Sequence, residues 1–176
     1  MTEISSNVKK YALIIAIISL LCLVLSFTFG FYPFINAEDS GLSIKSNLFG
    51  KGEMEFGATT VEIDKDDWDS WPTLASWITW LGFLVAFLAA VVYYLVNTGL
   101  LSLEVLDGQN FNLSLGMMAG SAIAFLGMIW WVMIQTGDDQ DLDLSDTGFG
   151  FWFHLLLALG IAALSHTIYT IERDSA

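Results

Sequence analysis

Two clusters of carboxylates are the stretches of the sequence best suited to chemistry. One is Asp64-Lys65-Asp66-Asp67-Trp68-Asp69, and the other runs from Asp138 to Asp146. Clustered carboxylate oxygens suit a hard divalent cation such as calcium, which takes about six to eight oxygen ligands. The candidate metal ligands are therefore Asp138, Asp139, Asp141 and Asp143, and the alternative is a solvated acidic surface.

The second cluster departs from the calcium loop of EF-hand proteins. With Asp139, Asp141 and Asp143 as the alternating ligands, Leu144 falls where the loop needs glycine and Gly150 where it needs glutamate. The spacing therefore favours a solvated acidic surface over a dedicated calcium loop, and no other cofactor is expected.

The two histidines, His154 and His166, lie in one apolar block. On a straight helix, twelve residues correspond to about 18 Å of rise and about 120° of rotation, so these two side chains do not share one metal ion. Both lie near the ends of the block, where a structural role competes with a functional one. Without a phosphate loop, a nucleophile elbow or a carboxylate pair in an apolar block, the chain is expected not to be an enzyme.

The apolar residues are concentrated in blocks, and 55% of the chain is hydrophobic against 14% charged. Four blocks lack Asp, Glu, Lys and Arg: residues 11–32, 73–96, 113–135 and 148–170. At about 1.5 Å per residue, each is long enough to cross the roughly 30 Å hydrocarbon core of a bilayer. The sequence predicts a single membrane domain over residues 1–176, with four transmembrane helices packed as a bundle.

The long segment between the first two blocks, residues 34–72, shows a period of two. Leu42, Ile44 and Leu48 alternate with polar residues, Gly50-Lys51-Gly52 resembles a turn, and apolar residues alternate again from Met54 to Ile63. We expect a small antiparallel sheet of about three strands outside the membrane. A sheet so small needs support, so it should pack on the mouth of the bundle or on a partner.

Basic and aromatic residues predict the orientation. Lys9, Lys10 and Arg173 flank the outermost blocks, which favours cytoplasmic termini in a multi-pass protein of the cell membrane. All tryptophans occur where the chain nears the opposite face, as expected for rings at headgroup level. This predicted interface belt comprises Trp68, Trp71, Trp77, Trp80, Trp130, Trp131 and Trp152.

The negative charge is concentrated on that same face. Nine of the 19 acidic residues lie in residues 34–72 and five in residues 136–147, and the net charge is −13. Such acidic loops are expected to be extracytoplasmic, and the charge argues against a nucleic-acid partner, whose phosphates require cationic contacts.

Small residues recur along the third block, at Gly116, Gly120, Ala124 and Gly127. Small residues let helix backbones approach closely within a membrane. The stripe predicts packing inside one bundle, with a homodimer face as the alternative.

The order of elements resembles the claudin and peripheral-myelin-protein-like four-helix group: helix, long outer loop with strands, helix, short inner loop, helix, short outer loop, helix. The resemblance covers nearly the whole chain as topology only. The Gly-Leu-Trp signature of claudins is Gly41-Leu42-Ser43 here, and the loop lacks the two cysteines, because Cys22 is the sole cysteine. No functional residue is carried over.

These observations predict a non-catalytic accessory or assembly subunit of a larger membrane complex. Its expected partners are membrane lipid and other integral membrane subunits, or a second copy of itself. Two alternatives remain open: a claudin-like adhesion or self-assembling barrier protein, and a small transporter or membrane enzyme with His154 as its polar anchor.

Overall fold

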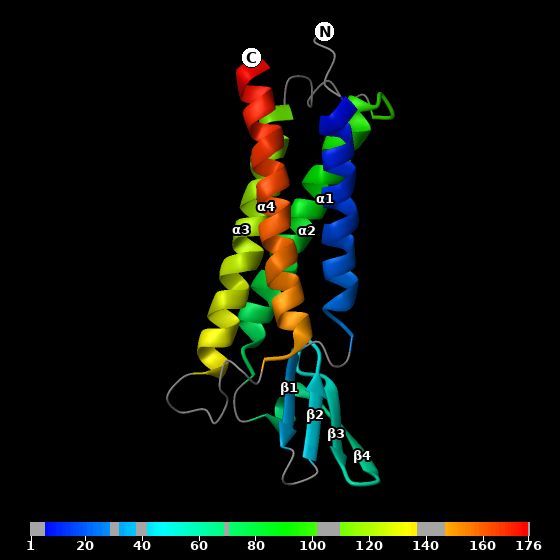
Figure 1. Ribbon diagram of the computed structural model, residues 1–176, viewed down its shortest axis with the longest axis vertical. Coiled ribbons are helices and arrows are strands. Elements are labelled where there is room, and N and C mark those ends of the chain that lie inside the picture. Colours follow the sequence, from blue (N-terminus) through cyan, green and yellow to red (C-terminus); the bar gives the residue numbers. More distant parts are fainter. Residues whose placement is uncertain are drawn as a thin grey trace.

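The computed structural model describes residues 6–28, 32–37, 42–68, 71–101, 110–136 and 147–175. Four long helices run side by side, and a small sheet extends from one end of them (Figure 1). The helices are α1 Ser6–Leu25, α2 Thr73–Asn97, α3 Asn110–Gln135 and α4 Phe149–Ser175. The strands are β1 Tyr32–Ala37, β2 Leu42–Ser46, β3 Gly52–Phe56 and β4 Thr59–Ile63.

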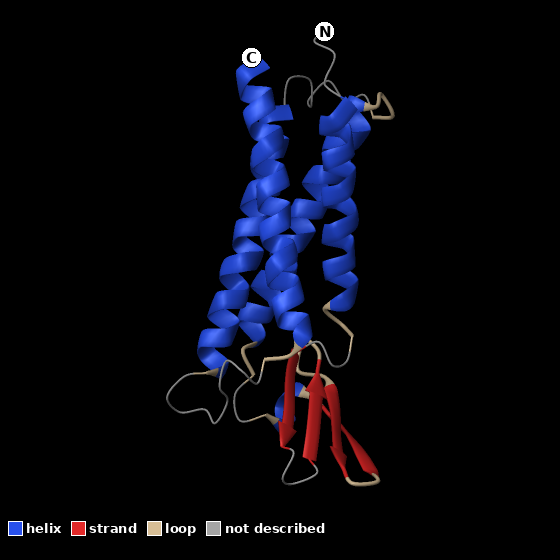
Figure 2. Cartoon of the chain, viewed as in Figure 1, coloured by secondary structure: helices blue, strands red, loops and turns tan. Residues whose placement is uncertain are grey.

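The chain is thus mostly helical, and all four helices are long and apolar enough to cross a membrane. The helices pack in the cyclic order α1, α2, α3, α4, with α1 also against α4. The start of α1 and the end of α4 lie at the end of the bundle opposite the sheet (Figures 1 and 2). The four helices therefore alternate in direction, as the predicted order of elements requires.

The outer surface of the bundle carries many large apolar side chains, as its interior does. Leu126 and Leu156 are 64% and 66% exposed, while Phe83 and Ile161 are fully buried. A helix that is apolar all around suits a core or a lipid environment, and these helices expose their apolar residues to the outside.

The prediction ended the fourth helix at residue 170, five residues before its observed end at Ser175. The first helix is where the predicted boundaries were most in error. It spans Ser6–Leu25 instead of residues 11–32. Lysine is a good helix former, so Lys9 and Lys10 do not delay the start. At the other end, the Phe27 and Thr28 amides turn back to the carbonyls of Val24 and Leu25, and the apolar run continues into a strand. An apolar run alone does not tell a helix from a strand.

The antiparallel sheet was predicted correctly in kind, but it has four strands in the order β1-β2-β3-β4 where about three were expected. The additional strand is β1, in the segment assigned to the end of the first helix and the start of the loop. β3 and β4 are joined by Gly57 and Ala58, and Gly57 has φ 58°. Glycine at the first position of a two-residue loop is typical of a type II′ hairpin turn.

The turn between β2 and β3 anchors the sheet to the bundle. The amide of the buried residue Leu48 donates to the Ser26 carbonyl at the end of α1, over 3.1 Å. Its carbonyl accepts from the Ser76 hydroxyl at 2.6 Å and from Trp71 Nε1 at 3.1 Å, both from the α2 side. The expected packing of the sheet on the bundle mouth is thus confirmed, and Leu48 joins two helices to the sheet.

Asn47 shapes this turn. Its side-chain oxygen Oδ1 accepts from the amides of Phe49 at 2.9 Å and Lys51 at 3.1 Å, and Gly50 takes a positive φ of 83°. An asparagine that bonds its own following backbone and a glycine with positive φ are typical of tight turns. The turn predicted at Gly50-Lys51-Gly52 is therefore present, but it lies slightly earlier: the Gly50 amide donates to the Asn47 carbonyl, and Gly52 already belongs to β3.

Candidate functional site

The four candidate metal ligands, Asp138, Asp139, Asp141 and Asp143, lie outside the described residues. Within the part of the chain that the structure describes, no three His, Cys, Asp or Glu side chains come together in a group that could hold a metal ion. The cation site therefore stays a prediction of the sequence.

The first acidic cluster is partly structural. Asp64 caps the short 3₁₀ helix η1, Lys65–Asp67: its Oδ1 accepts from the Lys65 amide at 2.7 Å. Asp67 Oδ2 accepts from the Asp64 amide, also at 2.7 Å. The Asp64 side chain also accepts from the Asp67 amide, and this reciprocal pair of bonds is a capping box. Two carboxylates of the cluster thus have partners that require no metal ion.

His154 is fully buried where three helices meet. Its Nε2 lies 3.0 Å from the Cys22 carbonyl of α1, and its Nδ1 lies 2.9 Å from the Gly150 carbonyl of its own helix. The ring also meets Phe83 of α2 edge to face, with centroids 5.7 Å apart. A neutral imidazole donates through one nitrogen only, whereas the doubly protonated ring donates to both carbonyls. The geometry links α4 to α1 close to the sheet end.

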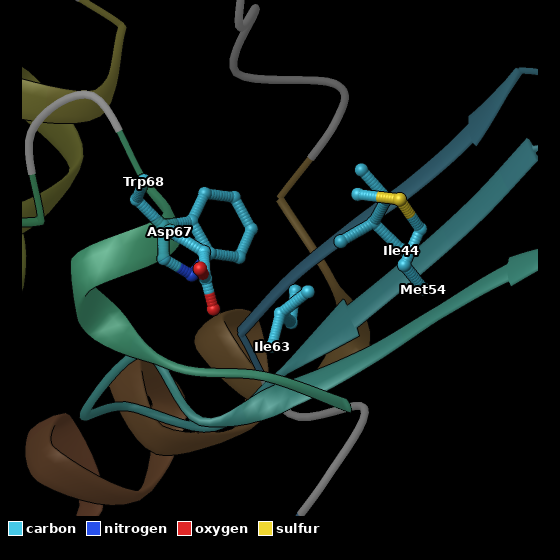
Figure 3. Close-up of a pocket in the computed structure, with 5 residues that line it drawn as sticks. All are labelled: Ile44, Met54, Ile63, Asp67 and Trp68. Carbon is cyan, nitrogen blue, oxygen red and sulfur yellow. The ribbon is translucent and has the colours of Figure 1, made fainter. Parts of the chain in front are cut away.

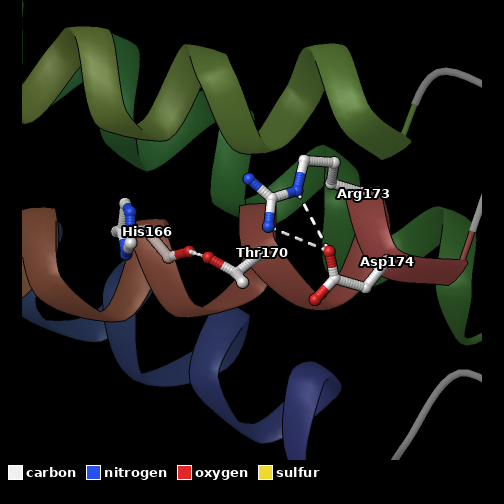
Figure 4. Close-up of polar contacts among 4 residues, drawn as sticks. All are labelled: His166, Thr170, Arg173 and Asp174. Carbon is white, nitrogen blue, oxygen red and sulfur yellow. Dashed lines mark hydrogen bonds and ion pairs between the residues drawn. The ribbon is translucent and has the colours of Figure 1, made fainter.

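His166 occupies a different environment and is exposed on α4. Figure 4 shows it near the C-terminal end of the helix, where its carbonyl accepts from the Thr170 hydroxyl at 2.8 Å and Arg173 pairs with Asp174 at 2.9 Å. The two histidines therefore differ in burial as well as in position along α4.

The small-residue stripe of α3 faces α2. A Cβ atom built on Gly120 would lie 2.5 Å from the Ala86 amide nitrogen, and one built on Gly127 would lie 2.6 Å from the Thr79 hydroxyl. Ala124 is fully buried, and its backbone approaches Gly82. A Cβ on Gly116 would have more room, 3.3 Å from the Ala89 Cβ. These residues carry the packing expected inside one bundle.

The seven tryptophans lie at the sheet end, but their side chains have different environments. Trp77, Trp130 and Trp152 are exposed on the bundle surface, whereas Trp131 is fully buried. Trp68 and Trp71 are half-buried and donate to the carbonyls of Gly50 and Leu48 at 3.0 and 3.1 Å. Part of the predicted interface belt therefore fastens the sheet to the bundle.

The sheet has one apolar and one polar face. Residues in register share a face, so Ile44, Met54 and Val61 form a row across β2, β3 and β4. The alternate positions carry Lys45, Glu53 and Glu62 on the opposite face. Such alternation is typical of a sheet with one face packed and the other in water.

The apolar face is only half covered. Near the bundle, η1 and Trp68 lie over it and leave a hollow of about 230 Å³, shown in Figure 3. The hollow is lined by Ile44, Met54, Ile63, Asp67 and Trp68. Farther out, Phe56 is 64% and Val61 53% exposed, so the apolar face is open at its distal end.

No protein-family model matches this chain, and no curated protein matches it significantly. The topological resemblance to claudins therefore remains a prediction, and the function has to be argued from the site itself.

Sequence reasoning missed the apolar face as a site, although its signal was present. The alternation from Met54 to Ile63 predicted strands, but the register decides which residues share a face. That register requires the two-residue turn at Gly57 and Ala58, where the alternation of apolar residues changes phase between Phe56 and Val61.

Proposed function

We propose that the protein is a non-catalytic accessory or assembly subunit of a multi-pass membrane complex in the cell membrane. In this proposal the four helices cross the bilayer, the termini are cytoplasmic, and the sheet and acidic loops are extracytoplasmic. The observation that carries it is the open apolar face: Phe56 and Val61 are exposed on a sheet that is hydrogen-bonded to the bundle through Leu48.

An open apolar face on a docked sheet favours a binding role. Large apolar side chains in water cost free energy that a partner recovers by covering them, at about 25 cal/mol per Å² of buried apolar area. A surface held by hydrogen bonds to two helices is also preorganised, so binding loses little conformational entropy.

The bundle supports the same role. Its buried histidine, His154, is engaged by backbone carbonyls of α1 and α4 and by the Phe83 ring of α2. Its tightest interface, between α2 and α3, is formed by glycines whose backbones are in contact. Both features suit a helical scaffold that presents the sheet.

The test is the size of the particle that carries this chain after gentle extraction of native membranes in a neutral detergent. We expect a particle larger than the lone chain with its detergent. We expect the double variant Phe56→Ser, Val61→Thr to dissociate from this particle and to migrate as the lone chain. The matched control is Leu88→Ser, which also replaces an exposed apolar residue, but on the bundle. A native chain that migrates alone would contradict the proposal.

A further inference from the structure

We propose that the free edge of β4 receives an extended segment of a partner protein in which apolar and basic residues alternate. This inference rests on the proposed function, because it names the chemistry of the partner that an accessory subunit would bind. It is carried by the register of the sheet, by the exposure of β4 and by the placement of two glutamates.

β4 is an edge strand with a pairing surface available. It is last in the sheet order, and Thr59, Thr60, Val61 and Glu62 are all exposed. Residues that flank a two-residue hairpin loop form a hydrogen-bonded pair, and pairs then alternate along an antiparallel ladder. Phe56 with Thr59 is that flanking pair, so the backbone groups of Thr60 and Glu62 point away from β3.

These outward-pointing groups can pair with another strand. In the described part of the chain, no backbone hydrogen bond joins β4 to anything except β3. Binding of an extended peptide to such an edge is a recurrent mode of recognition, in which the main chain provides affinity and alternating side chains provide specificity.

The polar face of the sheet specifies the charge of the partner. Glu53 and Glu62 are directly opposite each other on β3 and β4. By the alternation above they form a non-hydrogen-bonded pair, in which side chains are closest and like charges destabilise the sheet. Lys45 forms its ion pair with Glu55, at 3.3 Å. A basic side chain on an added strand would lie beside Glu62 and offset this repulsion.

The apolar face specifies the other half of the pattern. Val61 lies between Thr60 and Glu62 and points to the face that also carries Met54 and Phe56. An added strand therefore places its apolar side chains beside Val61 and its basic side chains beside Glu62. The exposed Val61 and Phe56 side chains would be covered in the same step.

A second copy of this chain fits the edge poorly. Within residues 42–68 there are six acidic residues against three lysines. Pairing two β4 strands would bring both copies of Glu53 and Glu62 into one strip of like charge. The partner is therefore a different, basic chain.

The experiment measures binding of short dye-labelled peptides to the full-length protein in nanodiscs of neutral lipid, by fluorescence anisotropy. The probes are Lys-Val-Lys-Val-Lys-Val, its acidic counterpart Glu-Val-Glu-Val-Glu-Val, and a block peptide with three lysines followed by three valines. We expect the alternating basic peptide to bind at least about fivefold more tightly than either of the others. Equal binding of the alternating and block basic peptides would overturn the proposal, because it would show attraction without strand pairing.

Two variants locate the site. Thr60→Pro removes an outward-pointing amide and leaves the β3 ladder intact, since proline is tolerated on the open side of an edge strand. This variant should bind the alternating basic peptide at least about fivefold more weakly than the native chain does. The matched control Thr60→Ala keeps the amide and should bind the peptide as tightly as the native chain. Glu62→Lys should reverse the preference toward the acidic peptide.

Unchanged binding in Thr60→Pro, or an unchanged preference in Glu62→Lys, would overturn the assignment of β4. Cross-linked dimers formed through Thr60→Cys in nanodiscs that hold two chains would overturn it in favour of a second copy. The particle-size test distinguishes the two proposals. If the large particle persists in Thr60→Pro, the accessory role stands, and the edge of β4 is not the surface that binds the partner.

Discussion

Gly82 and Gly120 face each other across the α2–α3 interface, and a Cβ atom built on either would lie 2.7 Å from the carbonyl oxygen of the other. The helices are therefore in backbone contact at this point. In a bilayer, the hydrophobic effect does not drive helices together, because the lipid chains are as apolar as the side chains. Close packing of the backbones is then a main source of association energy.

The first prediction follows from this contact. Gly120→Ala would place a methyl group 2.5 Å from the Ala86 amide nitrogen, and backbone atoms have little room to give way. We expect a loss of about 1–3 kcal/mol in unfolding free energy, measured by thermal unfolding in neutral detergent.

The matched control is Gly160→Ala on α4, where a Cβ meets nothing within 4 Å. That control should be neutral or slightly stabilising, because alanine is the better helix former. Equal stability of the two variants would contradict the interface.

The second prediction concerns the link between α1 and α4. His154→Phe keeps an aromatic ring against Phe83 but removes the contact of Nε2 with the Cys22 carbonyl. That carbonyl retains the Ser26 amide at 3.0 Å and the Ser26 hydroxyl at 2.7 Å, so the cost should be about 0.5–1 kcal/mol.

His166→Phe is the control for this prediction, because His166 is exposed and its contact with Thr170 uses the backbone carbonyl. Hydrogen exchange should report faster opening of α1 and α4 in the His154 variant alone. The same change in both variants would mean that His154 does not link these helices.

Much of the fold could be predicted from the sequence, because length and hydropathy decide which helices can cross a bilayer. The predicted bounds of α2, residues 73–96, differ from Thr73–Asn97 by one residue. The packing face of α3 could also be predicted from glycines such as Gly120. On a lipid-facing surface alanine would serve as well as glycine, so repeated glycines indicate a face where another helix comes close. The end of α1 could not, because the aromatic run from Phe27 to Phe34 contains no charged residue that would separate it from the helix before it.

The candidate site could be predicted only in part. His154 was recognised as a polar residue in an apolar block, but its carbonyl partners on α1 and α4 depend on helix packing that no local pattern encodes. The repulsive pair of Glu53 and Glu62 depends on strand register. A register shift of one residue would move Glu62 to the other face, so the sequence alone could not locate it.

The third prediction tests the orientation. Thr60 and Thr98 are exposed at opposite ends of the structure, and the native thiol of Cys22 is buried. With a membrane-impermeant maleimide, Thr60→Cys should label on intact cells and Thr98→Cys only after the cells are opened. The native chain is the control and should stay unlabelled. Labelling of Thr98→Cys alone on intact cells would mean that the termini face outward, and labelling of both would contradict a membrane-spanning arrangement.

The last prediction uses the tryptophans as depth markers. Trp77, Trp130 and Trp152 are exposed around the sheet end of the bundle, where headgroups should lie, whereas Trp131 is fully buried. Quenchers attached to lipids at headgroup depth should therefore quench a large part of the fluorescence, and quenchers near the bilayer centre much less. Changing the three exposed tryptophans to phenylalanine should remove most of the quenchable signal. Trp131→Phe is the control and should lower total emission while the quenchable signal persists. Strong quenching from the bilayer centre would place these rings in the hydrocarbon, which would contradict an interface at the sheet end of the helices.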